Sequence, residues 1–540
     1  MKYCLGVLIL LGMIGTASAQ QANWLWAKGG GGKGNDQSSS IAADSVGNIY
    51  VTGYYVDSAV FSGISLHPAK GSHLFLAKYS SLGSLLWIRT TGAVTGQSQG
   101  TGVSIGANKS LYVTGYFSDS LSLGSTILRS IGTENIFLAK YDLDGNIEWA
   151  VSAGGTGYDF GRSVSTDTSE NIYITGSFSG SSDFSGKQLT SVGGDDIFIA
   201  KYDSNGSVIW VKSFGSQTDD AGWGITVGHS GTIAVTGLFG DTIDFSGIKL
   251  ISKGISDIFI TKFSSDGVPL WVQQAGDTSV GKGQSIAMDR DENVYVTGNF
   301  VGGGIVPDCD GVGNIYIAKY SSGGVKEWMK CVGTGGEEFG AGVAVDSSGL
   351  YVTGGYDNTI NFGSGQIPNN GLFDIFIVKF DVSGNALWTD HAGAPKTDLG
   401  SAVALDPNGD LYLSGIFSDT CTFGAFSLQS FGNTDIFIAE IGTNSDVHEL
   451  HRTTNDAISF YPNPAKDKIN IDFISDSKED PLTIEIFSLL GVPIKKIIAP
   501  YSGIGNQIIS ILVGDLAKGI YLCRIISAGN MTSRTVVVGD

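Results

Sequence analysis

The sequence predicts an all-β protein: a seven-bladed β-propeller with four-stranded blades, followed by a small β-sandwich. The prediction depends on three columns of residues that recur roughly every sixty positions. The first is a tryptophan column, Trp26, Trp87, Trp149, Trp210, Trp271, Trp328 and Trp388. The second is a glycine column, Gly53, Gly115, Gly176, Gly237, Gly298, Gly354 and Gly415. The third is an aromatic column, Phe75, Phe137, Phe198, Phe259, Tyr316, Phe376 and Phe437.

Each repeat contains four segments of strand length. In one repeat these are 163–166, 171–176, 196–202 and 208–213, all rich in Ile, Val, Phe, Tyr and Trp and bounded by Gly, Asn, Asp and Ser. This composition is typical of strands joined by hairpin turns. A four-stranded sheet cannot bury both faces alone, so seven of them are expected to pack around one axis.

The two ends of the repeat region are expected to meet. The last repeat lacks its fourth segment, whereas residues 23–29, which carry Trp26, precede the first segment of the first repeat. The N-terminal strand is therefore predicted to close the last blade, which places Trp26 in one sheet with Phe437. A closed ring leaves no long unpaired sheet edge.

The beginning of the chain predicts export. Residues 1–19 combine Lys2, an apolar run over 4–14 and the small-residue cleavage pattern Ala17-Ser18-Ala19, as in a secretory signal peptide. No other run approaches the roughly 20 apolar residues of a membrane span. The formal net charge of −20 argues against nucleic acid or an anionic membrane as partner. A secreted protein without membrane insertion is expected.

Behind the signal peptide, we expect the propeller over 20–441, a polar linker over 442–456 and a second all-β unit over 457–540. This last unit has six or seven short apolar segments, a number that suits a sandwich.

Two families are recognisable from these residues. The repeats resemble SBBP-type β-propeller repeats, through Gly-Asn-Ile-Tyr-Val-Thr-Gly at 47–53 and Asp-Ile-Phe-Ile-Ala-Lys-Tyr at 196–202. The C-terminal unit resembles the type A sorting domain of the type IX secretion system of Bacteroidetes. That second resemblance is carried by Tyr461, Pro462, Asn463, Pro464, Gly491, Gly519 and Tyr521. It implies the type IX machinery as a partner, passage across the outer membrane, and release or attachment at the cell surface.

A column of acidic residues follows the tryptophans. Ten positions after each repeat tryptophan, five of the seven repeats carry a carboxylate: Asp36, Asp159, Asp220, Glu338 and Asp398. One explanation is structural, because side-chain oxygens at loop-to-strand junctions accept backbone N–H bonds. The alternative is an acidic ring near the axis that holds Ca²⁺ or a cationic ligand, since hard cations prefer oxygen ligands. No motif requires any other cofactor.

Three aromatic residues lie near these acidic residues, in the connections from one repeat to the next, and are candidates for ligand contact: Tyr158, Trp223 and Phe339. Sugar-binding surfaces expose aromatic rings, although filling of the core explains such residues equally well. Trp223 stands out, because no other repeat has tryptophan at that position.

The fifth repeat is irregular. Between Gly298 and Tyr316 it is four residues shorter than the equivalent span of the other repeats, and it contains Cys309, with Cys331 in the following segment. In an oxidising compartment the two cysteines predict a disulfide. Cys421 and Cys523 are expected to be buried thiols.

The sequence contains no Gly-x-Ser-x-Gly, His-Glu-x-x-His or phosphate-loop motif, so no catalytic residue is predicted. We expect a secreted or cell-surface, non-enzymatic propeller that binds a polysaccharide or a surface protein. The expected binding surface is the long-loop face, the face of the ring that carries the long connections between the second and third strands of each repeat. Two alternatives stay open: a carbohydrate-active enzyme that uses two loop carboxylates, and a surface scaffold without a small ligand.

Overall fold

A computed structural model describes residues 22–67, 70–91, 96–276, 279–301 and 313–443. In the C-terminal part it describes residues 458–461, 466–475, 482–488, 493–499, 505–514, 516, 518–527 and 530–538. The predicted signal peptide with Ala17 and Ala19, and most of the predicted linker, lie outside these ranges. The chain divides into two compact units, Met1–Thr443 and Asn444–Asp540.

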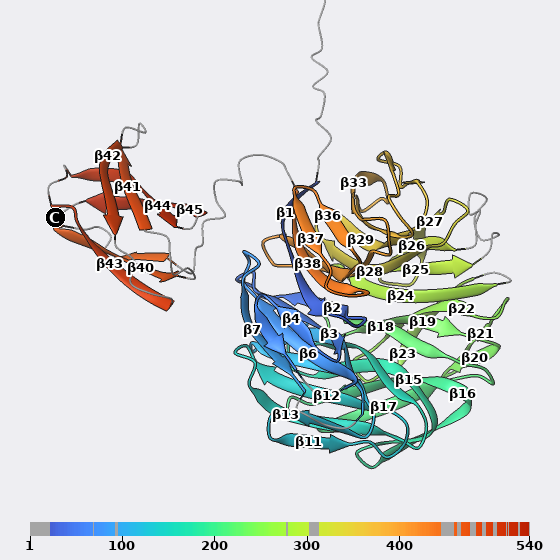
Figure 1. The fold of residues 1–540 in the computed structure, drawn as a ribbon. Helices are drawn as coiled ribbons and strands as arrows, with labels where there is room; N and C mark the ends of the chain where they lie inside the picture. Colours follow the sequence, from blue (N-terminus) through green and yellow to red (C-terminus); the bar gives the residue numbers. More distant parts are fainter. Residues whose placement is uncertain are drawn as a thin grey trace, which may run out of the picture. The chain divides into compact units, whose positions relative to one another are not determined.

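Every regular element in the described ranges is a strand, and none of these residues forms a helix able to cross a membrane. The first unit consists of four-stranded antiparallel sheets (Figure 1). Along the chain, three of them are β2 (Gln37–Ala43), β3 (Ile49–Val56), β6 (Ser72–Tyr79) and β7 (Leu85–Thr90); β8 (Ser98–Ile105), β9 (Ser110–Phe117), β12 (Asn135–Asp142) and β13 (Ile147–Gly155); and β14 (Asp159–Thr166), β15 (Ile172–Phe184), β16 (Lys187–Tyr202) and β17 (Val208–Phe214).

Four more sheets follow, and the last of them takes its fourth strand from the beginning of the chain. They are β18 (Ala221–Val227), β19 (Ile233–Phe239), β22 (Asp257–Phe263) and β23 (Pro269–Ala275); β24 (Val280–Met288), β25 (Val294–Val301), β26 (Asn314–Tyr320) and β27 (Lys326–Val332); β28 (Glu338–Asp346), β29 (Gly349–Tyr356), β32 (Asp374–Phe380) and β33 (Ala386–Ala392); and β34 (Leu399–Leu405), β35 (Leu411–Phe417), β38 (Asp435–Thr443) and β1 (Ala22–Gly32).

The first strands of these sheets form a closed circle. β2, β8, β14, β18, β24, β28 and β34 each contact the next in this order, and β34 contacts β2. Hydrophobic clusters join neighbouring sheets, as where Ile377 and Trp388 of one sheet pack with Leu413 and Phe437 of the next. The core of the first unit therefore lies between the sheets.

The N-terminal strand closes the last sheet, as the sequence predicts. β1 pairs antiparallel with β38, with Trp26 opposite Glu440 and Gly29 opposite Phe437. Trp26 and Phe437 thus lie in one sheet. The strand runs further than expected, and Gly30–Gly32 continue into pairing with β4 (Ala59–Phe61) of the next sheet.

Of the second-to-third connections, the one between β25 and β26 lies outside the described residues over 302–312, and the other six are ordered hairpins rather than open loops. They are β4 with β5 (Ile64–Leu66), β10 (Ser120–Leu123) with β11 (Thr126–Arg129), the extended ends of β15 and β16, β20 (Thr242–Phe245) with β21 (Ile248–Ile251), β30 (Ile360–Asn361) with β31 (Gln366–Ile367), and β36 (Thr420–Phe423) with β37 (Phe426–Gln429). Two of these hairpins also pair with the outer strand of the preceding sheet, β4 with β1 and β15 with β13. These two hairpins therefore contribute to the contacts between sheets.

The tryptophan column connects successive sheets. Six indole N–H groups donate to a backbone carbonyl in the next sheet's turn between its third and fourth strands, at 3.0–3.2 Å: Trp26 to Ser81, Trp87 to Leu143, Trp149 to Ser204, Trp210 to Ser265, Trp271 to Ser322 and Trp328 to Val382. The seventh, on Trp388, is buried without an acceptor in the described part of the chain. The next sheet there is the one closed by β1, which has no such turn.

The second unit has two sheets. One contains β39 (Ile458–Tyr461), β40 (Lys468–Ser475) and β43 (Gly505–Leu512); the other contains β42 (Pro493–Ala499), β41 (Leu482–Ser488), β44 (Gly519–Ser527) and β45 (Asn530–Val538). Both contribute to one cluster, with Ile471 and Ile511 from the first sheet and Ile486 and Cys523 from the second.

Part of the predicted sorting motif can be placed in this unit. Tyr461 ends β39, and Gly519 and Tyr521 lie at the start of β44. Pro462, Asn463, Pro464 and Gly491 fall outside the described residues.

We expect Trp149→Phe to destabilise the first unit by about 1 kcal/mol more than Trp388→Phe, because only the first change removes a formed hydrogen bond. Urea unfolding followed by tryptophan fluorescence measures the difference. All nine tryptophans belong to the first unit, so the signal reports that unit alone. Equal losses in the two variants would contradict a stabilising role for the indole bond.

Candidate functional site

The innermost strand of every sheet contains a β-bulge at an equivalent position. Its pairing with the second strand skips one residue, and the skipped residues are Ser39, Thr101, Arg162, Trp223, Gln284, Ala341 and Ser401. A bulge leaves one residue unpaired and changes the direction of its side chain. The glycine column lies beside the bulge: a Cβ on Gly53 would come within 1.9 Å of the Gln37 carbonyl oxygen. This close approach explains why glycine recurs there.

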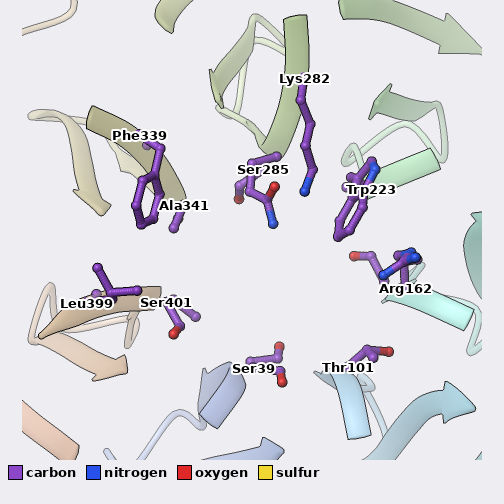
Figure 2. Close-up of a pocket in the computed structure, with 18 of the residues that line it drawn as sticks. Ser39, Thr101, Arg162, Trp223, Lys282, Ser285, Phe339, Ala341, Leu399 and Ser401 are labelled. Atoms are coloured by element: carbon purple, nitrogen blue, oxygen red, sulfur yellow. The ribbon is translucent and has the colours of Figure 1, made fainter. Parts of the chain in front are cut away.

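The bulged residues line a cavity at the centre of the circle of sheets. Its volume is about 750 Å³, and all seven innermost strands contribute to its lining. Figure 2 shows labelled side chains from these strands pointing into the central space. The bulge is thus the device by which each sheet presents one side chain to the cavity.

The wall of the cavity does not follow the symmetry of the sheets. Arg162, Trp223 and Lys282 lie next to one another on three consecutive sheets (Figure 2). The Arg162 guanidinium carbon is 3.9 Å from the centroid of the Trp223 ring, and Lys282 Nζ is 3.1 Å from it. Elsewhere the bulged positions hold smaller side chains such as Ser39 and Ser401. One side of the cavity is therefore cationic and aromatic, whereas much of the rest is small and polar.

The two cations of this wall are only weakly compensated. Neither Arg162 nor Lys282 has a carboxylate within 4 Å among the described residues. Glu134 and Asp195 act on Arg162 from farther away. Burial, and then the neighbouring guanidinium, lower the pKa of Lys282 to about 7. In addition, Arg162 Nε and Trp223 Nε1 are buried without a hydrogen-bond acceptor in the described structure.

Hydroxyl and amide groups line other parts of the cavity. The hydroxyl of Tyr54 donates to the side-chain oxygen of Gln37 at 3.2 Å, and that of Tyr116 donates to Gln99 at 2.6 Å. With these oxygens occupied, the amide nitrogens of the two glutamines stay as donors. The lining can therefore form hydrogen bonds with a polar ligand.

The structure places the acidic column in the interior of the first unit. All five residues, Asp36, Asp159, Asp220, Glu338 and Asp398, are buried. No group of three or more Asp, Glu, His or Cys side chains that could hold a metal ion occurs among the described residues. These residues give no support to a shared Ca²⁺ ring, which stays a prediction.

Hydrogen bonds support the structural explanation of the column. Backbone N–H groups donate to Asp36 from Val56 at 2.8 Å, to Asp220 from Gly240 at 2.9 Å and to Asp398 from Ser418 at 2.8 Å. Asp159 accepts from the Gly155 N–H at 2.8 Å, and Glu338 accepts from the Thr334 hydroxyl. These carboxylates satisfy local donors at the junctions of strands, one sheet at a time.

The three predicted aromatic candidates lie in different places. Trp223 and Phe339 line the cavity. Tyr158 lies outside the described lining, is half exposed and stacks on Phe160 with ring centroids 6.1 Å apart. Arg162 and Lys282 were not predicted. The signal for Arg162 is the three-residue pattern at the bulge, Gly161-Arg162-Ser163, which recurs as Gly222-Trp223-Gly224.

The cysteines agree with the sequence analysis as far as the structure describes them. Cys331 is disulfide-bonded, while Cys309 lies outside the described residues, so the pairing of the two stays a prediction. Cys421 and Cys523 are buried free thiols, each within a hydrophobic cluster.

Comparison with protein families finds two matches. A secretion system C-terminal sorting domain matches residues 459–539. A beta-propeller repeat matches residues 29–54, 148–184 and 270–299.

Two curated proteins are similar in sequence. An uncharacterised WD repeat-containing protein of Acanthamoeba polyphaga mimivirus is 25% identical over 500 residues, which cover 73% of this chain and 36% of that protein. The regulatory protein FlaEY of Caulobacter vibrioides is 29% identical over 200 residues, which cover 35% of this chain and 20% of that protein. The chain thus spans well under half the length of either relative.

Among solved structures, PorZ of Porphyromonas gingivalis, a bacterial surface component of the type-IX secretion system, is 9% identical. The match covers 93% of this chain and 81% of that chain with a TM-score of 0.25. A likeness this low carries no argument about the present chain.

The buried acidic column makes stability depend on pH. Burial raises the pKa of Asp398 to about 7 from an ordinary 3.8. A raised carboxyl pKa means that the fold favours the protonated form, so its stabilising contribution is complete below about pH 4 and is lost as the pH rises through 7. We therefore expect Asp398→Asn to flatten the decrease of unfolding free energy between pH 4 and 8.

Asp142→Asn serves as the control for this experiment. The pKa of Asp142, in an exposed turn, is lowered by its hydrogen bonds, so it titrates below this pH window. Urea unfolding at several pH values measures both variants. A slope as steep in Asp398→Asn as in the unchanged protein would contradict the assignment.

Proposed function

We propose that this protein is secreted to the cell surface and binds a ligand in its central cavity. Its β-propeller repeats and its secretion-system C-terminal sorting domain support this proposal. The ligand is a polysaccharide or another surface protein. In this proposal the seven sheets are the blades of one propeller, the second unit is a β-sandwich that directs export through the type IX system, and the N-terminal signal peptide starts that export.

The observation that carries the proposal is the break in symmetry at the bulges. Ser39, Ala341 and Ser401 show that the fold accepts a small side chain at this position. The fold therefore does not require Arg162 and Trp223, which stand at equivalent places on adjacent sheets. The cation–π contacts with Trp223 stabilise the pair, but burial and the neighbouring guanidinium oppose it by lowering the pKa of Lys282. Side chains that the fold does not require at these positions point to a ligand.

The cavity, rather than the long-loop face, is the proposed location. The six described second-to-third connections are hairpins, and two of them pair with the preceding sheet. The cavity is concave and combines aromatic, cationic and hydrogen-bonding side chains, as small-ligand sites do.

We propose binding without catalysis. The carboxylates of the lining are Glu337 and Glu338, which are consecutive residues. Glu337 precedes β28 and is exposed, whereas Glu338 is the first residue of β28 and is buried. Two carboxyl groups that act on one glycosidic bond must instead flank it from both sides. This arrangement favours a binding site over a glycosidase.

We expect the mature full chain to bind selected members of an array of polysaccharides and purified surface proteins. Trp223→Leu should weaken that binding about tenfold or more, because it removes the large ring from the cavity wall. Tyr158→Ser, which changes a half-exposed ring outside the described lining, should leave binding within about twofold. Biolayer interferometry on the array hits measures both.

Loss of binding in Tyr158→Ser alone would place the binding site at the connections between sheets, outside the cavity. No binding to any array member would overturn the proposed function in favour of a scaffold role.

A further inference from the structure

We infer that the ligand of the central cavity is an acidic saccharide, whose anionic group lies against Arg162 and Lys282 and whose hydroxyls bond to the polar lining. This inference rests on the proposed function and names the ligand's chemical class.

The first argument is charge. The chain has a formal net charge of −20, yet Arg162 and Lys282 lie side by side on the cavity wall without a carboxylate partner within 4 Å among the described residues. Burial and Arg162 disfavour the charged form of Lys282, whereas an anion placed between the two side chains favours that form and is attracted by both. The wall therefore prefers an anionic ligand to a neutral one.

The second argument is the form of the cationic wall. Arg162 Cζ and Lys282 Nζ lie 3.9 Å and 3.1 Å from the same Trp223 ring. The ring fixes both long side chains, so less conformational entropy is lost when a ligand arrives. Arg162 Nε is buried and has no acceptor in the described structure. A guanidinium with free donors matches the two oxygens of a carboxylate or sulfate.

The third argument is the remaining lining. The side chains of Ser39, Ser401 and Gln284 make no hydrogen bond within the described structure, and the Gln37 and Gln99 amide nitrogens stay as donors. Hydroxyls and amides of this kind pair with the hydroxyl groups of a sugar. The cavity volume of about 750 Å³ lies in the usual range for ligand pockets.

The nearby acidic residues do not cancel this preference. Glu338 is buried, accepts from the Thr334 hydroxyl and has its pKa raised by burial, which disfavours its charged form. Glu337 is exposed. Glu134 and Asp195 influence Arg162 without forming an ion pair within 4 Å. The cationic pair thus stays available to an external anion.

Isothermal titration of the full chain tests the inference with three hexasaccharides of similar size: oligomannuronate, chondroitin sulfate and neutral mannohexaose. We expect one or both acidic probes to bind and mannohexaose to bind at least about tenfold more weakly. Arg162→Gln and Lys282→Gln should each lower the affinity for the acidic probe about tenfold, as expected for a lost hydrogen bond to a charged group. Added salt should weaken the acidic probe further.

The control variant is Lys187→Gln with Lys249→Gln, two exposed lysines on β16 and β21 outside the described lining. It matches the change in net charge of the Arg162→Gln, Lys282→Gln double variant, and it should retain affinity within about twofold. Urea unfolding of each variant confirms that the fold is intact.

The outcomes separate the inference from the proposed function. Equal binding of mannohexaose, or unchanged binding in the cavity double variant, overturns the inference and leaves a ligand-binding cavity in place. No binding of any probe, together with array hits that need Trp223, also overturns only the inference. No array hit and no probe binding overturns both. Binding of oligomannuronate, whose only anionic groups are carboxylates, would show that a carboxylate is sufficient.

Discussion

The pairing of β1 with β38 is the interaction on which the first unit depends. It joins Ala22 to Thr443 and thereby turns a row of sheets into a closed circle. Without that pairing β38 would expose an unpaired edge, and β2 would lose its neighbour on one side. The central cavity exists only because the circle is closed, since its lining comes from every innermost strand. The proposed ligand site therefore depends on closure of the ring.

Within the closed circle, the repeated residues and the exceptional residues have separate tasks. The repeated ones satisfy the fold: indoles bond to the next sheet, glycines make room beside the bulge, and buried carboxylates accept backbone N–H groups. The exceptional ones stand at positions that the fold leaves open. Arg162 and Trp223 occupy a bulge position where Ala341 is also accepted. The side chain at these positions can therefore change without altering the fold.

Much of the fold follows from the sequence, and the cavity wall does not. The columns of Trp, Gly and Phe predict the repeats because each column makes the same contact in nearly every sheet. Closure by the N-terminal strand follows from the missing segment of the last repeat. The acidic column was ambiguous, because a carboxylate that accepts backbone N–H groups and one that binds a cation look alike in sequence. Arg162 escaped notice because strand alternation is interrupted at a bulge, so the face that its side chain occupies cannot be counted from its neighbours.

The closing sheet has a consequence for how this protein is made. Trp388 packs against that sheet, whose strands come from opposite ends of the first unit, so the pairing that closes the circle joins residues far apart in sequence. Ala22 must wait until Thr443 has been synthesised and delivered, and pairing between residues so distant in sequence is intrinsically slow. During that interval the early repeats exist as an incomplete arc. The closed circle, and with it the central cavity, is therefore complete only after the first 443 residues have been synthesised.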